Sequence, residues 1–154
     1  MKNLFQKEAQ SEIDNRIDKI TADSAALWGK MNVGEMICHV SDQLRMALGD
    51  IETTDASNWL QRNLLITFIM WGLKAPKGKV QTSVELEQHG GKGTKPETLA
   101  ADKDKLKILI QRFIERNETG GTYSRHSVFG QLNNKRWSKL AYSHLDHHLE
   151  QFGA

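Results

Sequence analysis

The clearest structural signal in the 154-residue chain is the stretch NVGEMICHVSDQLRMALG, residues 32–49. Asn32 followed three residues later by Glu35 fits a capping box, in which each side chain binds a free backbone N–H of the first helical turn. Gly49 is a suitable C-terminal stop. Between these signals, apolar residues recur at steps of three and four, the period of an amphipathic helix; they are Val33, Met36, Ile37, Val40, Leu44 and Leu48.

The same periodicity predicts further helices on both sides of this stretch. They cover about Asn3–Ile20, Ser57–Leu73, Leu99–Asn117 and Asn133–Phe152. The segment Ser57–Leu73 is apolar on more than one side, so we expect it to be the most buried. Core packing is likewise the expectation for the four tryptophans, which are Trp28, Trp59, Trp71 and Trp137.

Lys74–Lys95 is expected to be a long loop, with Val80–Leu86 as a candidate short strand. Long helices with almost no strand pattern favour an all-α fold, a helical bundle with crossover loops. The length fits one domain, 1–154, with no internal repeat or second domain.

Composition excludes several classes of protein. The 21 basic and 19 acidic side chains give a net charge of +2, too small to indicate nucleic acid or an anionic membrane as a partner. The most apolar window, residues 64–73, is about half as long as a membrane-spanning helix requires. The single cysteine, Cys38, rules out an internal disulfide and a thiolate-rich zinc site, and we expect a buried, inert thiol. These features predict a soluble, cytoplasmic protein.

Histidine is the unusual residue type, because three of the six lie in the sequence HLDHH, residues 144–148. His144 and His148 fall in the apolar stripe of the last helix, and residues four apart place their β-carbons about 6 Å from each other. His39, among apolar neighbours in the helix 32–49, is the candidate third ligand of a metal ion. Three protein ligands with an open position are typical of a catalytic metal site. The alternative is that backbone carbonyls, or Asp146 and Glu150, satisfy the pair.

Several residues near these histidines have two possible interpretations. Asp42 and Asp146 are either hydrogen-bond partners of the ligand histidines or solvated charges on outer helix faces. Gln151 either lines the rim of the pocket or makes a helix-surface hydrogen bond. His147 lies about 100° round the helix from His148, so it is either a neighbour of the site, which is the expectation, or a further ligand.

Two blocks of sequence resemble the DinB-like (DinB/YfiT) metalloprotein superfamily, and more narrowly a branch catalogued as a domain of unknown function. The first block is WGKMNVGEMICHV, residues 28–40, which ends in His39. The second runs from His126-Ser127-Val128-Phe129-Gly130 through Trp137 to the clustered histidines and Gln151. Ser127 stands where the branch usually has proline, so His126 is either a fourth ligand or a turn residue held by the neighbouring backbone.

The resemblance implies a four-helix bundle with up-down-down-up topology, often a homodimer. It also implies that a divalent ion (nickel, zinc or iron) binds at the positions of His39, His144 and His148. Characterised relatives include transferases that add a low-molecular-weight thiol such as bacillithiol, mycothiol or glutathione to an electrophilic small molecule. The alternatives are a metal-binding or small-ligand-binding protein without turnover, and a metal-free structural member.

Overall fold

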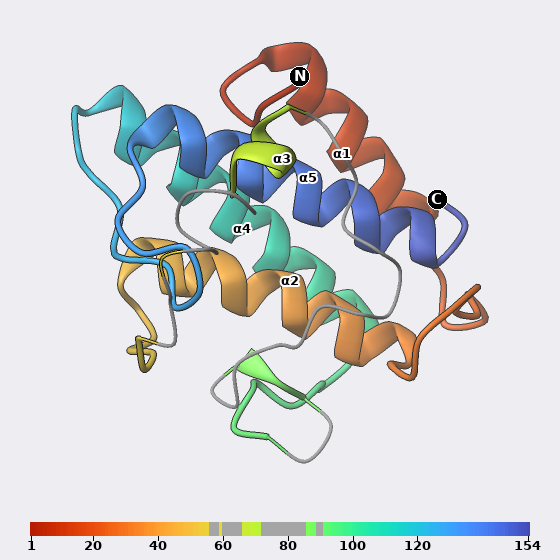
Figure 1. Cartoon of the computed structure of the whole chain (residues 1–154). Coiled ribbons are helices and arrows are strands. Elements are labelled where there is room, and N and C mark those ends of the chain that lie inside the picture. The colour runs from red at the N-terminus through yellow and green to blue at the C-terminus, as the bar shows by residue number, and fades with distance from the viewer. Residues whose placement is uncertain (56–58, 60–65, 72–85, 89–90) are drawn as a thin grey trace.

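A computed structural model describes residues 1–55, 59, 66–71, 86–88 and 91–154, and within them the fold is all-α without strands. Residues His126 and Gly130 form one isolated β-bridge. The helices in Figure 1 are α1 (Lys7–Lys19), α2 (Val33–Leu48), α3 (Ile66–Met70), α4 (Leu99–Glu118) and α5 (Asn134–Gln151). The predicted all-α bundle is confirmed.

Helices α1 and α5 run in the same direction. At one end, the backbone N–H of Leu4, just before α1, donates to the carbonyl of Ser138 (3.3 Å). At the other end, Arg16 Nη1 lies 2.6 Å from Asp146 Oδ1. The two helices are therefore parallel.

Helices α2 and α4 form the second parallel pair, which is antiparallel to the first. Gly34 lies against Pro96 where both helices begin, and Arg116 Nη1 donates to Leu48 O (2.7 Å) where both end. The ring of Phe5 stacks on that of Phe113, with centroids 5.9 Å apart, so the start of α1 meets the end of α4. The four long helices are thus up-down-down-up in chain order (Figure 1).

The ends of α2 follow the local sequence. Asn32 Oδ1 accepts from Glu35 N and Glu35 Oε2 accepts from Asn32 N, each at 2.9 Å, so the predicted capping box is present. Gly49 ends the helix with φ +83°, a left-handed conformation that glycine adopts without steric cost. Asn133 caps α5 by accepting from Arg136 N (2.9 Å), again as expected.

α1 begins later than predicted. Asn3 accepts from Phe5 N through its side chain (3.0 Å) and from Gln6 N through its carbonyl (3.1 Å). These bonds form a turn that replaces the first helical turn. Leu4 within this turn is nevertheless fully buried, as the apolar pattern indicated.

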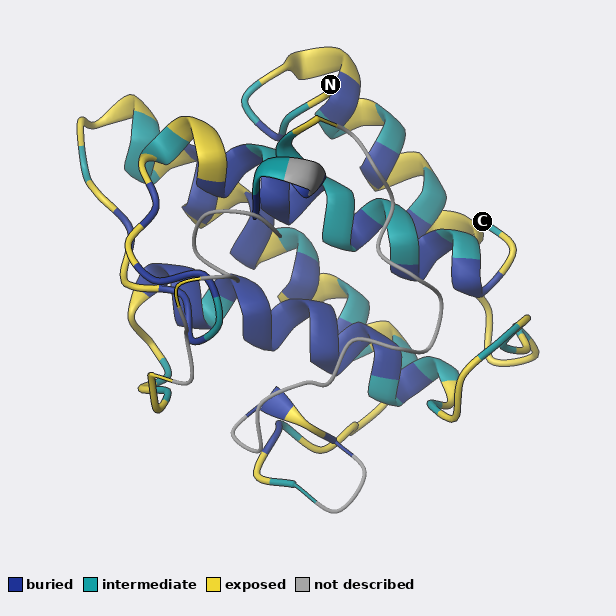
Figure 2. Cartoon of the chain, viewed as in Figure 1, coloured by how far each residue is buried: buried dark blue, intermediate teal, exposed yellow. Residues whose placement is uncertain are grey.

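α2 is buried along nearly its whole length, including polar residues such as Ser41, Asp42 and Gln43 (Figure 2). α4 and α5 pack on it from two sides, and residues 86–88 and 94–96 cover part of a third. The amphipathic pattern predicted only one buried face, because it carries no information on loops that pack over a helix.

The expectation that all four tryptophans pack in the core was wrong for two of them. Trp137 is fully buried and Trp28 is half-buried, but Trp59 and Trp71 are 75% and 76% exposed. α3 does contribute buried Ile66 and Ile69. Most of the predicted helix 57–73 lies outside the described residues, as does the candidate strand 80–86 except for Leu86. In the described part of the chain, no helix is long and apolar enough to cross a membrane.

Candidate metal centre

His39, from the middle of α2, faces His144 and His148, which lie one turn apart on α5. The ring centroids are 4.9 Å apart for His39 and His144, 4.8 Å for His39 and His148, and 4.6 Å for the α5 pair. One nitrogen from each ring lies within 4.8 Å of the others. We call these three residues the histidine cluster. Among the described residues, it is the group with the geometry to hold a metal ion.

A hydrogen-bond relay orients His148. Its Nδ1 lies 2.8 Å from Gln151 Oε1, and Gln151 Nε2 donates to the carbonyl of Trp28. A carbonyl can only accept, so the glutamine must present its amide NH₂ to Trp28 and its oxygen to His148. Nδ1 of His148 therefore carries the proton, and Nε2 keeps its lone pair for a ligand. Gln151 is buried and takes part in this relay; it does not lie at an exposed rim.

His39 is oriented in the same way by a backbone group. Its Nδ1 lies 3.2 Å from the carbonyl oxygen of Leu86, which assigns the proton to Nδ1. The lone pair then lies on Nε2, which is 3.1 Å from Nε2 of His144. This contact between His39 and His144 is stable only with a proton or a cation between the two nitrogens, because two imidazole lone pairs facing each other repel.

His144 completes the fit to a metal ion. Its Nδ1 is buried and has no hydrogen-bond partner among the described residues. This nitrogen has no described partner whether it carries the proton or a lone pair, so it does not decide between a proton and a cation shared by the two Nε2 atoms. A cation bound by the Nε2 atoms leaves no facing lone pairs, and neutral imidazole suits zinc, nickel and iron alike. The residues present therefore fit a divalent metal ion.

Burial keeps all three imidazoles neutral. It is the largest cause lowering the pKa of each, to about 3 for His148, below the ordinary value for His39 and well below it for His144. Repulsion from the other histidines acts in the same direction on His144 and His148. Neutral imidazole is the form that binds metal, so the cluster is ready to bind at pH 7.

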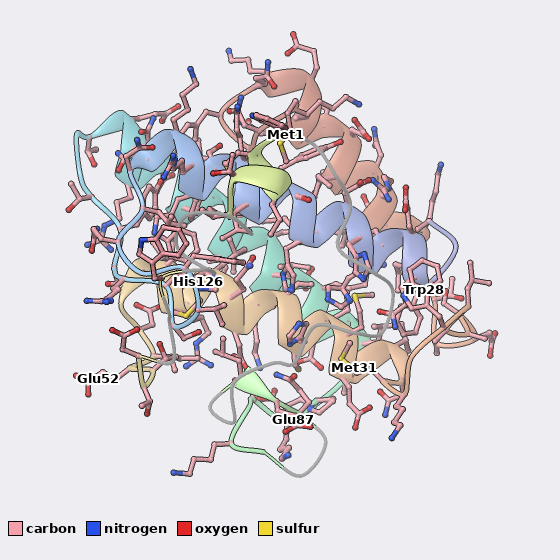
Figure 3. The ribbon with its side chains drawn as sticks, viewed as in Figure 1. Met1, Trp28, Met31, Glu52, Glu87 and His126 are labelled. Carbon is pink, nitrogen blue, oxygen red and sulfur yellow. The ribbon has the colours of Figure 1, made fainter. Side chains whose placement is uncertain are left out.

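His126 lies outside the histidine cluster, towards the end of the bundle opposite Trp28 (Figure 3). Its Nδ1 accepts from the backbone N–H groups of Val128 (3.0 Å) and Phe129 (3.3 Å). These contacts match the alternative of a turn residue held by its neighbours. His147 also lies outside the cluster, with its ring edge-on to Trp28 at 5.7 Å.

The two acidic candidates bind other groups. Asp146 pairs with Arg16, which ties α5 to α1. Asp42 is fully buried and binds loop residues Gln88 and Thr94, so neither of its two expected roles is correct. Burial is the main cause that raises the pKa of Cys38 to about 12, which agrees with an inert thiol.

Sequence reasoning missed the acceptors that orient the cluster. The carbonyls of Leu86 and Trp28 belong to the backbone, which every residue carries, so no residue type marks them. Gln151 was named from the sequence as a rim or helix-surface residue, and its position at i+3 from His148, on the same helix face, fits the hydrogen bond that it makes to His148.

Fold and site together define a helical bundle with a buried three-histidine cluster between its second and last long helices. The chain belongs to the family described as "Protein of unknown function (DUF1569)", which it matches over residues 3–154. Comparison with curated proteins and with solved structures finds no match.

Replacing Gln151 with leucine is expected to weaken zinc binding about 10- to 100-fold, the usual effect of removing an outer-shell partner of a metal ligand. The change removes the acceptor that keeps the proton on His148 Nδ1. Competition with a chromophoric chelator measures the affinity. Gln10→Leu is the matched control, since Gln10 Nε2 donates to Leu4 O (2.8 Å) and lies away from the cluster. Equal affinities for the two variants would contradict the relay.

Acid is expected to destabilise the metal-free protein below pH 6.5. His126 and His148 have pKa values lowered to about 3 by burial, whereas in the unfolded chain they titrate near 6.5. Between these values the unfolded state binds more protons than the folded state. The stability that the two neutral histidines contribute is therefore complete above pH 6.5 and is lost as the pH falls. Each of the two residues lowers the free energy of unfolding by about 2 kcal/mol between pH 7.5 and 5.

Urea unfolding at the two pH values measures this loss. His126→Gln should lose about 2 kcal/mol less than wild type over the same interval, because glutamine does not titrate. An unchanged pH dependence in this variant would contradict the assignment of a low pKa to His126.

Proposed function

We propose that this chain binds a divalent metal ion, nickel, zinc or iron, through His39, His144 and His148, and acts as a metal-dependent transferase. The substrates would be a low-molecular-weight thiol and an electrophilic small molecule. The observation that carries the proposal is the 3.1 Å distance between His39 Nε2 and His144 Nε2. The Nδ1 atoms of His39 and His148 already donate to other acceptors, which leaves the Nε2 atoms of these rings for a ligand. A cation between these nitrogens accounts for this arrangement.

A metal ion held by three neutral imidazoles keeps its positive charge and would stabilise a bound thiol as the nucleophilic thiolate. The chain itself supplies the rest. Three protein ligands leave a position for an exogenous group. Gln151 and the Leu86 carbonyl hold their histidines in the metal-binding tautomer, and burial of the cluster limits the access of water. Because Cys38 is a buried, inert thiol, the reacting thiol would come from the substrate.

We also propose that the family belongs to the DinB-like superfamily. Two features support this: the up-down-down-up order of the long helices, and the positions of His39 on α2 and of the pair on α5. Both match what the resemblance of the two sequence blocks implies. The homodimer that this superfamily often forms stays a prediction.

One observation favours a second function, metal or small-ligand binding without turnover. Asp42 binds the loop above α2, Asp146 pairs with Arg16, and Glu35 caps α2. These three carboxylates, all near the cluster in sequence, are therefore engaged away from it, which favours binding without turnover.

The test is an assay of metal-loaded protein with bacillithiol, mycothiol or glutathione, and an electrophilic chlorobimane. We expect at least one thiol to be conjugated faster by the loaded protein than by protein stripped with a chelator. Full metal loading with no acceleration for any thiol would reject the transferase and support the binding function. Failure to load metal would reject both the transferase and the metal-binding function.

A further inference from the structure

Asp42 is a carboxylate with no solvent exposure, on the side of α2 that the described loop residues 86–88 and 94–96 cover. Its Oδ2 accepts from Gln88 Nε2 (2.8 Å) and from Thr94 N (2.8 Å). Its Oδ1 accepts from Thr94 Oγ1 (2.6 Å) and lies 3.3 Å from Arg45 Nη1. A buried charge is tolerated when it is satisfied in this way. The loop therefore binds α2 through one fully satisfied carboxylate.

Residues 87–88 of this loop also form hydrogen bonds with residues 93–95. Gly93 N donates to Glu87 O (2.9 Å), and Lys95 Nζ donates to Gln88 O. A β-carbon on Gly93 would lie 2.5 Å from Gln88 Nε2 and 2.8 Å from Glu87 O, so only glycine allows this approach. Figure 3 shows Glu87 in this loop, next to α2. Residues 87 and 88 are thus bound to residues 93 and 95, and Gln88 is bound to Asp42 as well.

This segment carries the group that orients His39. Leu86, two residues before Gln88, provides the carbonyl that accepts from His39 Nδ1 (3.2 Å). Burial lowers the pKa of His39, and three groups oppose it by favouring the charged ring: the Leu86 carbonyl, the Asp42 carboxylate and the Gln88 amide. All three belong to the assembly around Asp42.

We infer that Asp42 is a positioning residue of the metal centre: it holds segment 86–88 against α2, which places the Leu86 carbonyl on His39 Nδ1 and leaves His39 Nε2 to bind metal. The inference rests on the proposed metal binding. It assigns Asp42 an indirect role, through Gln88 and the backbone of Leu86, with no contact to the ion. A loop that served only to cover α2 could do so through apolar contacts and would not need a buried charge.

Asp42→Asn tests the inference. Asparagine keeps the size but turns one acceptor into a donor, which faces the N–H groups of Gln88 and Thr94 in one orientation of the amide and Arg45 Nη1 in the other. We expect zinc affinity, measured by chelator competition, to fall about 10- to 100-fold. Asp102→Asn is the matched control, because Asp102 is also buried (3% exposed) but accepts from Glu97 N (3.0 Å) on the α4 side. This control should lose stability and keep its zinc affinity.

A second measurement needs no metal. ¹⁵N NMR of the histidine rings at pH 8 should show His39 with its proton on Nδ1 in the wild type and in Asp102→Asn, and a mixture of tautomers in Asp42→Asn. If the wild type binds neither zinc, nickel nor iron, the proposed function is rejected, while the tautomer measurement still tests the role of Asp42. Gln88→Leu, which leaves Asp42 its Thr94 and Arg45 partners, takes the place of Asp42→Asn if that variant does not fold. Wild-type tautomer and wild-type affinity in the folded variant would overturn the inference.

Discussion

Replacing His144 with alanine is expected to weaken zinc binding about 100-fold or more. Structural zinc sites with four ligands gain about 10–16 kcal/mol, or about 3 kcal/mol for each ligand. A loss of that size corresponds to about two orders of magnitude in affinity. His144 is central to the cluster, since its Nε2 lies 3.1 Å from His39 Nε2 and its ring is 4.6 Å from that of His148. Isothermal titration or chelator competition measures the change.

His147→Ala is the matched control for this variant. It removes a histidine from the same helix, adjacent to His148 but outside the cluster. Its zinc affinity should stay within about threefold of the wild type, well below the effect of losing a ligand. If both variants lose affinity equally, or if His144→Ala binds zinc like the wild type, the ligand assignment is wrong.

Replacing Trp137 with alanine is expected to lower the free energy of unfolding by about 4 kcal/mol and the melting temperature by about 10 °C. Trp137 has no exposed surface, and its indole Nε1 donates to Ser124 O (3.0 Å). Its ring also packs 5.2 Å from His126, so the change leaves a cavity and an unpaired carbonyl beside the turn before α5. Thermal and urea unfolding followed by circular dichroism measure the loss.

Trp71→Ala is the control for this large-to-small change. Because 76% of Trp71 is exposed, its removal should change the free energy of unfolding by no more than about 0.5 kcal/mol. A loss at Trp71 as large as that at Trp137 would show that burial does not explain the difference between the two tryptophans.

Much of the fold could be predicted from the sequence because its signals are local. Asn32, Glu35 and Gly49 fix both ends of α2 through bonds between near neighbours. Exposure of Trp59 and Trp71 could not be predicted, because a tryptophan at a helical position looks the same whether the facing side is covered or open. That information depends on which elements pack together.

The candidate site divides in the same way. The spacing of His144 and His148, and the apolar surroundings of His39, predicted that three rings would meet. Apart from Gln151, the groups that orient the rings were not predictable. The Leu86 carbonyl is 47 residues from His39 along the chain, and Asp42 acts through a loop whose sequence has no regular period. Polar loop contacts of this kind depend on the folded backbone.

The measurement that most directly tests the metal centre is the metal content of protein purified without a nickel column, before and after incubation with Zn²⁺ or Ni²⁺. The proposal predicts about one divalent ion per chain after loading, lost when the protein is unfolded in acid. A content below about 0.2 ions per chain that neither metal raises would contradict it, because a buried cluster of neutral imidazoles should take up these ions.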